Sequence, residues 1–201
     1  MNALERKGIE FASLASKALE DSELLSELLE GLRSKKDTLR SNCFEVLHLM
    51  SKNNPDILYS KWDFFATMLE SDNAYHKLIG VKILANLTRA DEAKRFEGLF
   101  DRYYDLLSDS VIVAGHLAAC SGTIAKAKPE LRFEITRRLL SIDRTAQKHK
   151  DLVKAYAIDA FNAYFEEAEN KSEILQFVRN QLNCQSPKTR EKAKTFLKTW
   201  G

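Results

Sequence analysis

The chain has 201 residues, of which 44% are hydrophobic and 30% are charged, and its formal net charge is +2. This length is enough for one domain with a sizeable core, and so small a net charge points to no particular class of partner. The 7 glycines and 3 prolines are too few for a turn-rich β protein, and no stretch reaches the roughly 18 apolar residues of a membrane span. We therefore expect an all-α protein without membrane-spanning segments.

The first twenty residues predict a leading helix over 2–19. Its apolar residues fall on one stripe, which is formed by Phe11, Leu14, Ala15, Ala18 and Leu19. We expect this helix to cap the unit that follows, with Asp21 and Ser22 capping the next helix. Charged residues precede any apolar run, so no signal peptide is predicted. The three cysteines are odd in number and widely separated, which favours a reducing, cytoplasmic setting.

A repeat follows the leading helix. Three segments align without gaps when Ser34, Ser71 and Ser108, which are 37 residues apart, share one column. A second column contains Arg40, Lys77, Ala114, Lys154 and Arg190, which we call the basic column although Ala114 departs from it. Apolar residues recur three, six, seven and ten positions past the basic column, which is the spacing of one helical stripe. The first of these positions is mostly small: Cys43, Gly80, Leu117, Ala157 and Ala193.

A further amphipathic helix is predicted before each of these segments, over 24–32, 57–69, 96–107, 131–140 and 174–182. The chain thus divides into a capping helix over 1–20 and five helical hairpins, over 22–52, 54–88, 91–127, 129–168 and 170–200. We expect the hairpins to form one domain over 1–201. Pro55, Pro129 and Pro187 each stand where a helix is expected to begin.

The last hairpin carries a resemblance to a known family. Ser186 and Pro187 begin it, followed by Arg190, Ala193 and Leu197, and this pattern resembles the HEAT-repeat, armadillo-like α-solenoids. No hairpin keeps the full pattern, so the resemblance concerns architecture. It implies a right-handed α-α superhelix that serves as a non-catalytic scaffold or adaptor for other proteins. A generic helical bundle is the alternative.

The second helices of HEAT-like solenoids line a concave side that usually binds a partner. The exposed columns should lie two, five and eight positions past the basic column, which would also expose Ile79, Ala85 and Gly122. Small side chains at Ala119 and Gly122 indicate either a shallow groove for a helix or peptide or a tight superhelical curve. The candidate partner-binding residues are Asn42, Glu45, Lys82, His116, Ala119, Tyr156, Asp159 and Asn162.

A basic surface is the second candidate site. Residues 171–201 hold seven Lys or Arg against two Asp or Glu, whereas residues 1–33 hold four against seven. A basic stripe could neutralise phosphates, and a solvated face is the alternative that charge runs usually favour. The candidate anion-binding residues are Arg137, Arg138, Lys148, Lys150, Lys154, Arg190 and Lys192.

These residues support an alternative function, a nucleic-acid-associated HEAT protein distantly similar to the DNA glycosylases built from HEAT-like repeats. Such enzymes need a concave carboxylate beside aromatic residues, and Asp159 with Tyr156 is the pair placed for it. No catalytic motif, metal-ligand spacing or phosphate-binding loop is found, so we expect no enzyme activity, cofactor or metal. Trp200 lies in a core column at the end of the series, which indicates a monomer or a weak dimer through the C-terminal end.

Overall fold

The computed structural model describes residues 3–6 and 8–201, and within these residues it is all helical. Twelve α-helices and seven short 3-10 helices follow one another, and no strand occurs in the described residues. The chain forms two compact units, residues 1–92 and 93–201. No helix of the described residues is both long enough and apolar enough to cross a membrane.

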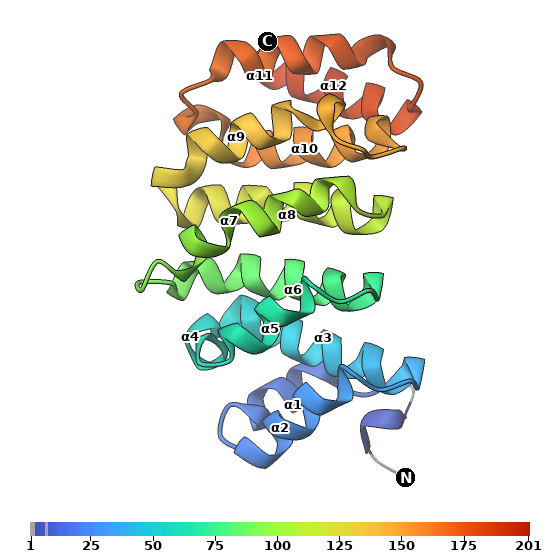
Figure 1. The fold of residues 1–201 in the computed structure, drawn as a ribbon, viewed down its shortest axis with the longest axis vertical. Helices are drawn as coiled ribbons and strands as arrows, with labels where there is room; N and C mark the ends of the chain where they lie inside the picture. Colours follow the sequence, from blue (N-terminus) through green and yellow to red (C-terminus); the bar gives the residue numbers. More distant parts are fainter. Residues whose placement is uncertain (1–2, 7) are drawn as a thin grey trace. The chain divides into compact units, whose positions relative to one another are not determined.

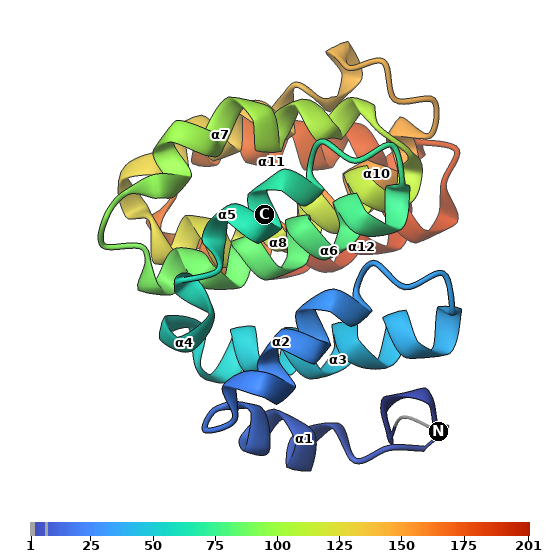
Figure 2. The same cartoon turned by 60° about the horizontal axis from the view of Figure 1, so that its bottom comes forward.

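The N-terminal unit is organised around α3 (Asp37–Asn53). The 3-10 helix η1 (Ala3–Glu5) and α1 (Phe11–Ala18) pack against it, as does α2 (Ser22–Gly31). On its other side α3 contacts α6 (Ala74–Leu87), which is covered by α4 (Pro55–Tyr59) and α5 (Trp62–Met68). Figure 2 shows α1 and α2 beside α3. A 3-10 helix, η2 (Thr88–Ala90), ends the unit.

Two predicted helices of the N-terminal unit differ from the expectation. The leading helix begins at Phe11 instead of residue 2, because Gly8 adopts a φ of +73°, which a helix cannot contain. Residues 2 and 7 of that prediction, and residue 1 of the capping segment over 1–20, lie outside the described residues. The helix predicted over 57–69 is divided into α4 and α5, since Lys61 leaves the helical region at φ −100° and ψ 15°. Both differences concern local backbone conformation, which apolar spacing does not reveal.

The C-terminal unit contains six α-helices in three hairpins. α7 (Arg95–Asp105) precedes α8 (Val111–Ala127), α9 (Arg132–Leu140) precedes α10 (Lys150–Tyr164), and α11 (Lys171–Asn180) precedes α12 (Pro187–Trp200). The second helices contact one another in the order α8, α10, α12, and α9 contacts α11. Figure 1 shows α8, α10 and α12 running alongside one another at successive levels of this unit.

Short 3-10 helices extend or join these helices in the C-terminal unit. They are η3 (Leu106–Ser108), η4 (Pro129–Leu131), η5 (Ile142–Arg144), η6 (Phe165–Glu167) and η7 (Gln181–Asn183). Pro129 begins η4, whereas Pro55 and Pro187 begin α4 and α12, as the sequence predicts. Ser186 caps α12 by accepting a hydrogen bond from the N–H of Thr189.

The predicted helical stripe is the core of the second helices. The positions three past the basic column are all buried, and so are the apolar side chains of the other three columns, except for Cys120, Leu197 and Trp200, which are half-buried. Burying such side chains contributes roughly 1.5–3 kcal/mol each relative to exposure. The four-column periodicity is therefore a packing signal, and the remaining faces of these helices are where a binding site has to be sought.

Candidate binding face

In the C-terminal unit, three side-chain contacts join α10 and α12 at successive turns. The ammonium Nζ of Lys188 lies 3.8 Å from the ring centroid of Tyr156. One turn further along, Nζ of Lys192 lies 2.9 Å from Oδ1 of Asp159. Lys192, predicted to bind anions, and Asp159, predicted to bind a partner, thus form one ion pair. Each side chain is about two-fifths exposed, so the pair adds little stability.

The last turn of this face is held by Trp200. Its indole Nε1–H donates a hydrogen bond of 2.8 Å to Oδ1 of Asn162, and its ring packs on Phe165 at a centroid distance of 5.2 Å. Trp200 is therefore a packed side chain of the C-terminal unit, although it remains half-exposed. Asn162 is exposed, as the sequence predicts for its column, and its amide oxygen accepts the bond from α12.

Small residues allow α8 and α10 to approach closely. A Cβ on Gly122 would lie 3.0 Å from Cβ of Ala163, and a Cβ on Gly115 would lie 3.0 Å from the ring of Tyr156. The ring of His116 lies 6.4 Å from that of Tyr156, centroid to centroid. Gly122 is thus small because α10 packs against it, and the groove interpretation does not hold at this position.

The predicted exposed columns are only partly correct. Ile79, Ala85 and Gly122 are buried, because the second helices use a wider face for packing than the four-column stripe predicts. Ala119 is half-buried, and Glu45 is exposed. Lys82 is half-buried, with Nζ 5.4 Å from the ring centroid of Phe44. The eight candidate partner-binding residues belong to both units: Asn42, Glu45 and Lys82 to the first, and His116, Ala119, Tyr156, Asp159 and Asn162 to the second.

Asn42 binds the chain's own N-terminal segment. Its Nδ2 group donates hydrogen bonds of 2.8 Å to the carbonyl of Leu4 and 2.9 Å to that of Arg6. Beside it, Nζ of Lys36 lies 2.9 Å from the carboxylate of Glu5. The side chain of Leu4 is only 2% exposed. The part of the candidate face around Asn42 is thus already occupied by residues 4–6.

Two exposed apolar side chains mark a hollow that the sequence columns missed. Ile112 is 58% exposed and Leu152 is 41% exposed, and both line a hollow of about 230 Å³ at the N-terminal ends of the second helices. Each lies four residues before a predicted binding residue, His116 or Tyr156, and so on the same helical face. Extending the column two past the basic column by one turn towards the N-terminus would have found them. The lining residues are Val111, Ile112, Gly115, His116, Leu152, Tyr156 and Lys188.

Two of the predicted anion-binding arginines are surrounded by carboxylates. The guanidinium of Arg138 forms an ion pair with Asp101 and lies 3.8 Å from carboxylate oxygens of both Asp105 and Glu134. Arg137 also pairs with Glu134, at 3.1 Å. These acidic side chains cancel much of the positive potential that a phosphate would need.

The loop before α10 uses two of the predicted lysines. Nζ of Lys154 lies 2.7 Å from Oδ1 of Asp143 and 3.5 Å from Oδ1 of Asp151, and its side chain is only 8% exposed. Lys150 donates a hydrogen bond of 2.7 Å to the main-chain carbonyl of Asp143. Lys154 is therefore buried and paired, whereas the ammonium of Lys150 meets no carboxylate in these contacts.

Two arginines of the basic column, in the first and the last hairpin, donate hydrogen bonds to main-chain carbonyls of a neighbouring loop. Arg190 donates hydrogen bonds of 2.7 Å and 2.9 Å to the carbonyls of Cys184 and Gln185, in the loop before α12. In the same way, Arg40 donates a hydrogen bond of 2.9 Å to the carbonyl of Ser34, in the loop before α3. The guanidinium groups thus tie each interhelical loop to its second helix. Arginine supplies the several donors that such a loop requires.

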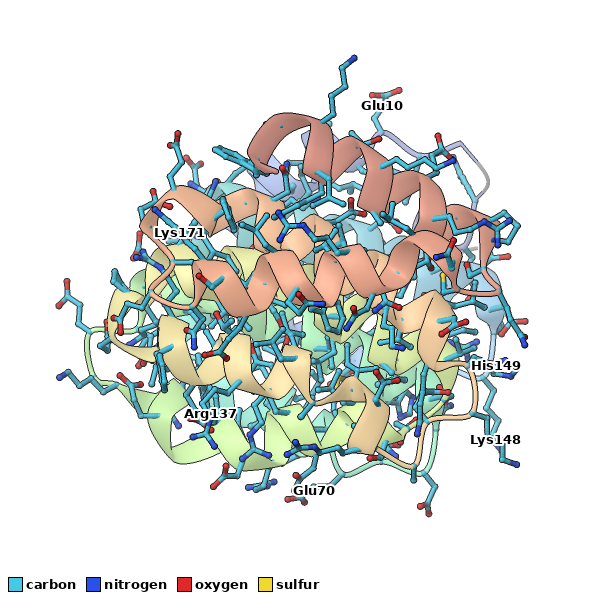
Figure 3. The ribbon with its side chains drawn as sticks, turned by 90° about the horizontal axis from the view of Figure 1, so that it is seen from above. Glu10, Glu70, Arg137, Lys148, His149 and Lys171 are labelled. Atoms are coloured by element: carbon cyan, nitrogen blue, oxygen red, sulfur yellow. The ribbon has the colours of Figure 1, made fainter. Side chains whose placement is uncertain are left out.

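The predicted basic surface is therefore dispersed. All of its members except Lys148 contact a carboxylate or a main-chain carbonyl in their own unit. Lys148 is exposed in the loop before α10, and Figure 3 shows it extending from a different part of the edge than Arg137. The structure does not bring these seven residues together into one stripe.

The groups with strongly perturbed pKa values lie in the core. Burial, with the charge of Glu27, raises the pKa of the Cys43 thiol to about 11. Burial raises the pKa of Tyr164 to about 12, although a hydrogen bond with Thr136 lowers it. The described residues contain no group of three His, Cys, Asp or Glu side chains arranged to hold a metal ion. Cys43, Cys120 and Cys184 form no disulfide bond within the described residues.

Comparisons with known proteins show no family for this chain. No family model matches it, and no curated protein matches it significantly. A crystal structure described as an engineered protein is similar, with 16% sequence identity over all of this chain and 98% of that one, at a TM-score of 0.48. So distant a likeness carries no argument about function.

Proposed function

We propose that this chain is a non-catalytic, right-handed α-solenoid of HEAT-like hairpins that binds a protein or peptide on the face of its second helices. The order of contacts within the C-terminal unit supports this architecture, because α8, α10 and α12 contact one another in succession and α9 contacts α11. Nearest-neighbour packing of successive hairpins is the principle on which solenoids are built. The buried four-column stripe agrees with it.

The observation that carries the binding function is the apolar hollow of the C-terminal unit. Among the described residues, four large hydrophobic side chains are strongly exposed: Ile57, Ile112, Phe133 and Leu152. Two of the four, Ile112 and Leu152, line this one hollow, although they come from different helices. Apolar side chains gathered on a surface are typical of sites that bind other proteins.

The charged groups favour a protein partner over a nucleic acid. Arg138 and Lys154 are held by carboxylates and Arg190 by loop carbonyls, so the phosphate-binding alternative loses its main cations. The glycosylase-like alternative needs a free carboxylate beside an aromatic ring. Asp159 is instead paired with Lys192, and Tyr156 with Lys188.

Capture from a lysate of the cells that encode this chain tests the proposal. We would compare the tagged wild-type chain with Leu152→Asp, and with Ile57→Asp as a matched change at an exposed residue of the other unit. Leu152 is the third residue of α10, where aspartate suits the helix N-terminus and should not unfold it. We expect discrete proteins that survive nuclease treatment and are lost only with Leu152→Asp. The proposal would be refuted if the captured proteins are lost on nuclease treatment, or if Leu152→Asp captures the same proteins as the wild type.

A further inference from the structure

We infer that the hollow between α8, α10 and α12 receives a short acidic segment of a partner protein, with an apolar side chain inserted between Ile112 and Leu152. This inference rests on the proposed function and specifies the chemistry of its partner. It has two supports: the charges around the hollow, and the segment of this same chain that occupies the corresponding place in the first hairpin.

The hollow is bordered by basic side chains. Lys188 lines it directly, and Leu152 is shared with a neighbouring hollow of about 510 Å³ in the loops before α10 and α12. The acidic residue at that border is Asp151, whose Oδ1 lies 3.5 Å from Nζ of Lys154 and whose Oδ2 accepts the N–H of Gln185 at 3.1 Å. The basic and titratable residues of the second hollow are Lys148, His149 and Lys150.

The contacts of two lysines at this border, Lys188 and Lys150, do not neutralise their positive charge. Lys188 lies over the uncharged ring of Tyr156, and Lys150 donates to a main-chain carbonyl. Neither contact supplies a negative charge, in contrast to the carboxylates around Lys154. An apolar hollow flanked by such ammonium groups is complementary to apolar residues flanked by Asp or Glu, and a basic segment would be repelled.

The N-terminal segment provides a precedent for this chemistry in the first hairpin. Leu4 is buried against the first hairpin, and the neighbouring Glu5 pairs with Lys36. Lys36 precedes the basic column by four residues, as Lys150 does in the fourth hairpin. An apolar residue followed by a glutamate is thus already bound beside a lysine at this place in the repeat. Tyr156, which lines the hollow with Ile112 and Leu152, stands two past the basic column as Asn42 does, so the hollow includes a position that corresponds to Asn42.

A displayed library of random peptides, panned against the full chain, tests the inference. We expect the enriched peptides to place Asp or Glu within a few residues of Leu, Ile or Phe. Two variants would be compared with wild type, Leu152→Asp for the apolar contact and Lys188→Glu for the charge. Lys194→Glu is the matched control, because Lys194 is exposed on the same helix and does not line the hollow.

The expected effects on the selected peptides differ between the variants. Leu152→Asp should abolish measurable binding, and Lys188→Glu should weaken it about fivefold, which corresponds to about 1 kcal/mol for an exposed charge pair. Lys194→Glu should leave it unchanged, and higher salt should reduce the effect of Lys188→Glu. Circular dichroism would show that each variant keeps its helical fold.

Three outcomes would overturn the inference: enrichment of basic peptides, enrichment that is independent of Leu152 and Lys188, or no enrichment. They are distinguishable from failure of the proposed function. If a discrete cellular protein is still lost with Leu152→Asp while the selected peptides are basic, the face binds protein and only the assigned partner chemistry is wrong.

Discussion

Replacing Gly122 with leucine tests the close approach of α8 and α10, which positions the candidate face. A Cβ at this position would lie 3.0 Å from Cβ of Ala163 and 3.3 Å from Cα of Ala160. Leucine adds three further carbons to that Cβ, and the backbone of α10 cannot move away as a flexible side chain could. Overpacking of this kind costs about 1–3 kcal/mol, whereas replacing a helical glycine gains about 0.5–1 kcal/mol.

We therefore expect Gly122→Leu to lower the free energy of unfolding by about 1–2 kcal/mol. Gly98 in α7 is the matched control, because it is exposed and a Cβ there would meet no atom within 4 Å. Gly98→Leu should raise the free energy of unfolding by up to about 1 kcal/mol. Urea denaturation, followed by circular dichroism, measures both. If Gly122→Leu is as stable as Gly98→Leu, α8 and α10 do not approach as described.

Three further predictions concern individual side chains. Burial raises the pKa of Tyr164 to about 12 from an ordinary value of 10, so its contribution to stability is fully present below pH 10 and is lost as the pH rises towards 12. Tyr164→Phe should therefore make the decline of the free energy of unfolding at alkaline pH shallower. An unchanged slope would contradict the burial of Tyr164. The thiol of Cys43 is fully buried with a pKa near 11, so alkylation followed by mass spectrometry should label it only in denaturant. Asn42→Ala removes two hydrogen bonds to the N-terminal segment and should lower the free energy of unfolding by about 1–2 kcal/mol. It should also speed amide hydrogen exchange around Leu4 and Glu5. Unchanged exchange would show that Asn42 does not hold the segment.

The sequence was most informative where a position's role depends on helical periodicity alone. Cys43, Gly80 and Ala193 are each buried, because the residue three past the basic column always faces the core. The exposure of the neighbouring columns could not be predicted equally well. Ile79 and Ala85 are buried since the width of a packed face depends on the adjacent helices, which a single helix's pattern does not contain.

The basic residues illustrate a second limit of sequence reasoning. Arg190 and Lys154 both add to the number of basic residues in the sequence. In the structure, however, Arg190 is hydrogen-bonded to a loop carbonyl and Lys154 is paired with a carboxylate. Which cations remain available depends on interactions between loops and helices that charge composition cannot reveal. The apolar hollow could not be predicted for a related reason, because Ile112 and Leu152 lie one helical turn before the expected exposed columns and on different helices, which only the packed structure brings together.

Site-specific photo-crosslinking from position 152 is the most direct test of the central claim that this face binds a protein segment. A photoreactive phenylalanine analogue at Leu152 would be compared with the same analogue at Phe133, an exposed residue of α9 outside the hollow. In a lysate treated with nuclease, the account predicts a discrete protein adduct from position 152 and none of the same mass from position 133. Identical adduct patterns from both positions, or no protein adduct from position 152, would contradict it.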